Sequence, residues 1–144
     1  MKQVLYLIML LVMTAACSKK NTDPVPTGAT LVAGTYDVSR VTITGAGASN
    51  VDATLPQTAT VNGAMVTRSA TVEATKFAES VIIARLVFKT TGQPDSITEL
   101  GNIEVRGAEL YQSNGKVGMA DGTTFSFDAP GLNGSRLVLI SKKR

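Results

Sequence analysis

The 144-residue chain contains no histidine, no tryptophan and a single cysteine. Without histidine it lacks the usual general base, the commonest metal ligand and every Ser-His or Cys-His catalytic arrangement. A lone cysteine excludes both an intrachain disulfide scaffold and a cysteine-rich metal site. We therefore predict a protein that is not an enzyme and has no catalytic residue, metal site or cofactor.

Charge of one sign is nowhere concentrated. The formal net charge is only +3, and the short basic runs are confined to Lys19-Lys20 and Lys142-Lys143-Arg144. Proteins that bind nucleic acid present a basic patch or stripe that neutralises phosphates. We predict no nucleic-acid partner and interpret the basic C-terminus as a solvated end.

The beginning of the chain has the pattern of an export signal. Lys2 provides a positive start, Val4 to Met13 is an unbroken apolar run, and Thr14, Ala15 and Ala16 supply small residues for signal-peptidase recognition. A membrane-spanning helix needs roughly 20 apolar residues, and this run is much shorter. Residues 1–16 are therefore predicted to be a cleavable signal peptide.

The only cysteine follows this run directly. The sequence Thr14-Ala15-Ala16-Cys17 resembles the lipobox of bacterial lipoproteins. The resemblance implies that Cys17 is acylated, becomes the mature N-terminus and anchors the protein to a membrane. Ser18 stands where aspartate often retains such proteins at the inner membrane. The resemblance therefore implies an outer-membrane lipoprotein of the cell envelope, with its domain facing either the periplasm or the outside.

The segment after the cysteine has no helical or strand period. Pro24 and Pro26 favour extended, unpaired backbone. We predict that residues 17–32 form the lipidated cysteine and a flexible tether, and that residues 33–144 form one folded domain.

Turn signals divide that domain into short segments. Because both residues of a type I′ hairpin turn need positive φ, Asn-Gly and Asp-Gly mark strand reversals. The candidate turns are Asn62-Gly63, Asn114-Gly115, Asp121-Gly122 and Asn133-Gly134. The stretch from Gly45 to Leu55 is predicted to be a loop.

The alternation of apolar and polar residues assigns faces to the strands. Tyr36 and Val38 share one face and Val41 and Ile43 the other, so a bulge is expected near Ser39-Arg40.

Two later segments follow the same logic. In residues 123–128, Phe125 and Phe127 should point into the core, with Thr124, Ser126 and Asp128 outward. The run from Leu137 to Ile140 indicates a last strand that is covered on both faces or closes a barrel against the first.

Residues 72–89 fit either a helix or two strands. Their β-branched content and the polar break at Ala78-Glu79-Ser80 favour two strands. The predicted fold is all-β, a small antiparallel up-and-down barrel of about eight strands, with a β-sandwich as the alternative.

Two groups of residues were weighed as catalytic candidates. Ser113 and Lys116 have the Ser-x-x-Lys spacing of penicillin-binding enzymes, but Asn114-Gly115 between them predicts a hairpin tip instead of a helix start. The second group is the carboxylates, which could supply the acid and base of a glycosidase: Glu73, Glu79, Glu99, Glu104, Glu109, Asp121 and Asp128. Most of them fall on the expected solvent face of a strand, and Glu104 and Arg106, which alternate with Ile103 and Val105, indicate an exposed polar stripe.

The layout as a whole resembles the small lipocalin-like domains of bacterial lipoproteins. It has a tether, then Gly34-Thr35-Tyr36 opening a bent first strand, then hairpins to a basic C-terminus. The resemblance implies a barrel whose interior or mouth binds a small apolar or amphiphilic ligand. Two alternatives remain open: a barrel filled by its own side chains, and a non-catalytic envelope module that binds another protein or is structural.

Overall fold

The computed structural model of the protein describes residues 28–45, 50–131 and 134–144. The predicted signal peptide with Thr14, Ala15 and Ala16, the lipidation site Cys17, most of the tether, and Asn133 lie outside the described residues. The described elements are α2 (Ala29–Val32), β1 (Gly34–Gly45), β2 (Val51–Thr54), β3 (Gln57–Val61), β4 (Ala64–Ala78), β5 (Val81–Thr90), β6 (Ser96–Arg106), β7 (Glu109–Gln112), β8 (Gly115–Ala120), β9 (Thr124–Pro130) and β10 (Ser135–Lys143).

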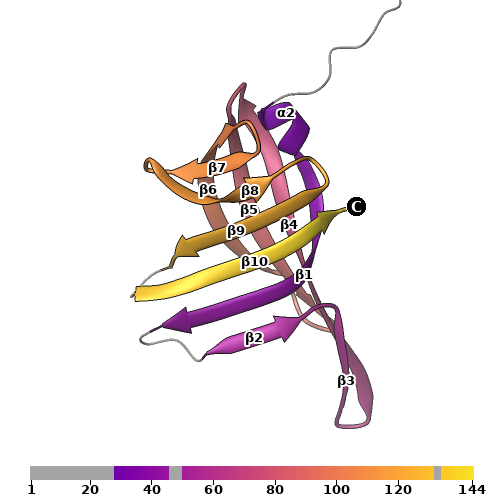
Figure 1. Ribbon diagram of the computed structural model, residues 1–144. Coiled ribbons are helices and arrows are strands. Elements are labelled where there is room, and N and C mark those ends of the chain that lie inside the picture. The colour runs from indigo at the N-terminus through magenta and orange to yellow at the C-terminus, as the bar shows by residue number, and fades with distance from the viewer. Residues whose placement is uncertain (1–27, 46–49, 132–133) are drawn as a thin grey trace, which may run out of the picture.

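These strands form a closed antiparallel barrel. The sheet order is β2-β1-β10-β9-β8-β7-β6-β5-β4-β3, and an additional pairing of β1 with β4 closes the ring (Figure 1). Eight strands, β1 and β4 to β10, make up the barrel, while β2 and β3 extend the sheet beyond the closure. The predicted all-β barrel of about eight strands is confirmed, and the two-layer sandwich does not form.

The expected bulge lies in β1. The pairing of β1 with β10 shifts register between Val38 and Arg40, so Tyr36, Val38 and Val41 are all buried inside the barrel. The bulge also divides the other edge of β1: Gly34 to Asp37 pair with β4, and Arg40 to Ile43 pair with β2.

The segment from Gly45 to Leu55 corrects one prediction. We expected a loop, but Val51–Thr54 pairs with β1 and a bidentate ion pair joins Arg40 to Asp52 across the two strands. The polar character of the segment did not prevent a strand, because β1 offers it an unpaired edge once β4 diverges.

Two hairpin turns lie at or next to the Asn-Gly dipeptides that predicted them. Asn62 and Gly63, with φ of 51° and 78°, connect β3 to β4 as predicted. Between β7 and β8 the positive φ values fall on Ser113 and Asn114, at 47° and 65°, while Gly115 begins β8. That hairpin is confirmed, with its turn one residue earlier than predicted.

The turn at Asp121-Gly122 is held by one carboxylate. Asp121 Oδ1 accepts hydrogen bonds from Thr124 N at 2.7 Å and from the N and Oγ1 of Thr123, both at 2.8 Å. These bonds hold the pKa of Asp121 well below its usual range, the bond from the Thr124 amide having the largest effect. Gly122 supplies the positive φ, at 86°.

Three further predictions about individual strands are confirmed. Phe125 and Phe127 are buried, and β4 and β5 are separate strands connected at Glu79-Ser80. For the last strand, closure against β1 is the alternative that holds, since Ile140 remains half exposed on the outer face.

Residues 28–32 do not belong to the tether. They form a turn and the short helix α2, whose Ala29 and Val32 are buried against one end of the barrel. Tyr36 Oη donates a hydrogen bond of 2.6 Å to the Val32 carbonyl, and Lys143 Nζ donates to Ala33 O at 3.0 Å. The buried residues of α2 are isolated apolar positions in a polar stretch and show no helical or strand period. The sequence pattern therefore placed the start of the folded domain at residue 33, whereas the structure begins it a few residues earlier.

Candidate functional site

The two ends of the barrel differ. At the end covered by α2, the large side chains of Tyr36, Phe125 and Leu110 are fully buried in the interior. At the opposite end, Ile43, Phe88 and Leu137 face inward but are only partly buried. The interior is therefore packed at the α2 end and incompletely filled at the other, which we call the mouth.

A cavity of about 470 Å³ occupies the mouth. Its walls come from both early and late parts of the chain, because all the contributing strands reach this end. The lining residues are Ile43, Leu86, Phe88, Thr98, Glu99, Leu100, Gln112, Phe127, Ala129, Pro130, Gly131, Ser135 and Leu137. Most of them are apolar, as in small-molecule sites, whose volumes are roughly 300–1,000 Å³.

Three neutral polar side chains belong to this inner wall. Thr98 is paired with the buried Leu86 across β5 and β6, so it shares the inward face. Gln112 is two residues after the buried Leu110 in β7, and Ser135 is two residues before the partly buried, inward-facing Leu137 in β10. Hydrogen-bonding groups thus lie among the apolar walls of the mouth.

The side-chain amide of Gln112 is oriented by the neighbouring strand. Its Nε2 donates to the Leu100 carbonyl at 2.6 Å and to the Asn102 carbonyl at 3.4 Å. Leu100 lies at a register shift in which Ala84 pairs with Gly101 and Arg85 with Glu99. Because the nitrogen is engaged by these carbonyls, Oε1 is the atom that Gln112 can offer as an acceptor.

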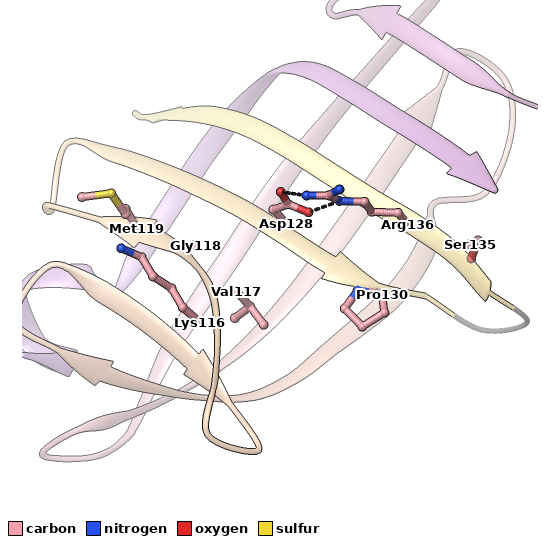
Figure 2. Close-up of a pocket in the computed structure, with 8 residues that line it drawn as sticks. All are labelled: Lys116, Val117, Gly118, Met119, Asp128, Pro130, Ser135 and Arg136. Carbon is pink, nitrogen blue, oxygen red and sulfur yellow. Dashed lines mark hydrogen bonds and ion pairs between the residues drawn. The ribbon is translucent and has the colours of Figure 1, made fainter.

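A second hollow, of about 520 Å³, lies on the flank of the barrel. The ladder between β8 and β9 runs only from Ala120 to Gly118, so the strands separate toward the mouth. Figure 2 shows Lys116 and Val117 on one side of this hollow and Asp128 and Arg136 on the other. Pro130 and Ser135 border both hollows.

The charges of this flank groove are paired with one another or with neighbours. Arg136 makes a bidentate pair with Asp128, with both distances 2.6 Å, and this pairing lowers the pKa of the carboxyl. Lys116 pairs with Glu109, which also accepts a hydrogen bond from Tyr111. A charged ligand would have to displace these partners, so the mouth is the better candidate site.

Of the residues considered for catalysis, Ser113, Lys116, Glu104 and Arg106 lie outside the mouth cavity, whereas Glu99 is among its lining residues. Ser113 has the positive φ of a hairpin turn. Lys116, on the following strand, pairs with Glu109. Glu104 and Arg106 form an exposed ion pair of 2.7 Å on the outer face of β6. Both groups therefore follow the hairpin and surface-stripe interpretations.

The inward polar residues Thr98 and Gln112 were missed by sequence reasoning. Alternation from Leu110 could have placed Gln112 on the inner face, but nothing in the sequence shows where the barrel stops being filled. In the described parts of the chain, no group of three or more cysteine or acidic side chains could hold a metal ion, and no helix is long and apolar enough to cross a membrane.

Comparison of the chain with known protein families, with curated proteins and with solved structures found no match in any of the three. The residues of this chain and their geometry are therefore what point to its function.

Proposed function

We propose that the barrel binds one small apolar or amphiphilic molecule in its mouth cavity. The observation that carries the proposal is the mouth itself, which is preformed, has mostly apolar walls and measures about 470 Å³. Burying an apolar chain there removes hydrocarbon from water at roughly 25 cal/mol per Å². It would also cover Ile43, Phe88 and Leu137, which the protein leaves partly exposed.

We propose that this role is binding without catalysis. The chain has no histidine to act as a base, and Glu99, the one carboxylate among the described lining residues, is paired with the exposed Arg85, so it belongs to the opposite face of β6 from Thr98. A nucleophilic hydroxyl needs an adjacent base to activate it.

The proposed setting is the cell envelope, with lipid on Cys17 holding the protein in the outer membrane. The support is the sequence pattern of residues 2–18 alone, with Ser18 as the basis for the outer membrane. Cys17→Ser is expected to abolish fatty-acid labelling and to block normal signal cleavage. Undiminished labelling of that variant would contradict the anchor, and fractionation with the inner membrane would contradict the sorting.

Native mass spectrometry of gently purified protein tests the binding role. The buried core lies within residues 29–141, so protein produced from residue 18 onward contains the whole barrel. We expect either a co-purifying molecule of lipid-like mass or one-to-one binding of an added alkyl amphiphile.

A matched pair of variants locates the site. Ala129 lines the cavity and Thr124, on the same strand, is exposed on the outer face. Ala129→Phe should abolish binding by filling the mouth, whereas Thr124→Phe should leave binding unchanged, with circular dichroism confirming that both variants fold. Equal binding by the two variants would place the ligand elsewhere.

A different observation favours the alternative role as an envelope interaction module. The hairpin of β3 and β4 projects beyond the barrel, and Val61 and Met65 near its tip are 47% and 72% exposed (Figure 1). Isolated exposed apolar residues are common, but two of them on one projecting arm offer another protein an apolar contact surface. Photo-crosslinking from position 65 in intact cells, compared with position 93 in the β5–β6 turn, tests this role.

A further inference from the structure

The charge inventory of the mouth restricts the ligand that it would hold. Among the described lining residues there is no lysine or arginine, and Glu99 is the only ionisable one. Two cations on the strands of the mouth are paired, Lys89 with Asp95 at 3.2 Å and Arg136 with Asp128 at 2.6 Å, and Arg68 on β4 does not line the cavity. An anionic head group in the cavity would find no cation and one carboxylate among the described lining residues.

The available hydrogen-bonding groups are neutral instead. Gln112 offers Oε1 because its nitrogen is held by the Leu100 carbonyl. Thr98 supplies a hydroxyl on the same inner wall, which can donate or accept. The pair suits a head group that both donates and accepts without carrying charge, and a hydroxyl has that chemistry.

The energetics of desolvation reinforce the distinction. A hydroxyl that reaches the half-buried Gln112 and the exposed Thr98 at the rim of the apolar walls can regain its hydrogen bonds there, so little is lost. An ionised carboxylate entering the same place loses its hydration shell and finds no opposite charge among the described lining residues. For an ammonium the one opposite charge is Glu99, which is paired with the exposed Arg85 and so belongs to the outer-face register of β6. The difference favours uncharged ligands over ions of either sign.

We infer that the mouth selects an uncharged, hydroxyl-bearing chain, such as a long-chain alcohol or an acylglycerol, over a fatty-acid anion, with Gln112 as the specificity-determining residue. This inference rests on the proposed binding function. It goes beyond that function by naming the chemical class of the head group and the residue that recognises it.

The test compares three probes with the same chain and different heads: dodecanol, dodecanoate and dodecyltrimethylammonium, each below its aggregation limit at neutral pH. We expect dodecanol to bind about tenfold or more tightly than either ion. Equal affinities would mean that the head stays in solvent, and tighter binding of either ion would mean that charge governs recognition; both results overturn the inference. Failure of all three probes to bind would instead refute the proposed function.

A substitution that reverses the preference gives a sharper test. Gln112→Lys places an ammonium group in the mouth and is expected to make dodecanoate the preferred probe. Gln57→Lys is the matched control, since Gln57 is exposed on β3 and does not line the cavity, so the preference for dodecanol should persist. Circular dichroism verifies that both variants fold. If Gln112→Lys still preferred dodecanol to dodecanoate, Gln112 would not set the specificity.

Discussion

The hydroxyl of Tyr36 offers the most direct test of how the closed end is held. Its Oη donates to the Val32 carbonyl at 2.6 Å, and both residues are fully buried. Burial, together with the negative charge of Asp121, raises the pKa of Tyr36, so the phenol stays protonated and able to donate. Tyr36→Phe removes this hydrogen bond and leaves the ring in place against Phe125, at a centroid distance of 5.4 Å.

Removing the donor leaves a buried carbonyl without that partner, which typically costs about 1–3 kcal/mol of the free energy of unfolding. With an m-value of about 1–3 kcal/mol/M for urea, the unfolding midpoint should fall by about 1 M. The slope itself should not change, because the folded and unfolded states expose the same surface as before.

Tyr111→Phe provides the matched control. It makes the same chemical change, but Tyr111 Oη donates to the carboxylate of Glu109 on the outer face at 2.7 Å, where water can replace it. Its effect should stay within about 0.5 kcal/mol. Equal effects of the two substitutions would show that α2 is not tied to the barrel by this bond.

Three further perturbations examine other parts of the barrel. Phe127→Ala should lower the free energy of unfolding by about 3–5 kcal/mol in chemical denaturation, since the side chain is buried, while Thr124→Ala on the exposed face should change it by less than about 0.5; comparable losses would mean that the strand register is wrong. Asp121→Asn should destabilise the protein at neutral pH. Because the pKa of Asp121 is lower in the folded protein, the carboxylate contributes its full stabilisation above its unfolded pKa of about 4 and loses it as pH falls through the folded pKa. The melting temperatures of the variant and the wild type should therefore converge in acid. A difference in melting temperature that did not change with pH would show that the charge of the carboxylate is not the cause. Gly118→Ala should cost about 1–3 kcal/mol in thermal melts because a Cβ there would collide with the Ser126 carbonyl on β9, and an unchanged melting temperature would show that β8 can move away.

Local chemistry explains why much of the fold could be predicted. The turn at Asn62-Gly63 needs positive φ at both residues, which few other dipeptides tolerate. The parity change between Val38 and Val41 can be accommodated only by an extra residue in the strand, so the bulge position follows from the pattern. Each of these features depends on a few neighbouring residues.

The parts that could not be predicted depend on contacts between distant segments. β2 forms because β4 leaves the edge of β1 after Asp37, a divergence that no local pattern records. The docking of α2 depends on a tyrosine in β1 and on Lys143 near the other end of the chain. The mouth arises where the inward side chains of several strands fail to fill the barrel, and Gln112 gains its role only from the Leu100 carbonyl beside it.

The separation of the two ends has a consequence for how binding and stability are coupled. The bonds that hold α2 and the fully buried side chains around Tyr36 lie at one end, and the cavity lining lies at the other. A ligand that binds only the folded protein raises stability by RT ln(1 + [L]/Kd), whatever holds the far end. Tyr36→Phe should therefore lower the melting temperature with and without dodecanol by similar amounts and leave the affinity unchanged. Ala129→Phe should abolish the ligand-induced shift. If Tyr36→Phe weakened dodecanol binding as well, the closed end would be controlling the shape of the mouth, and the barrel would act as one cooperative unit.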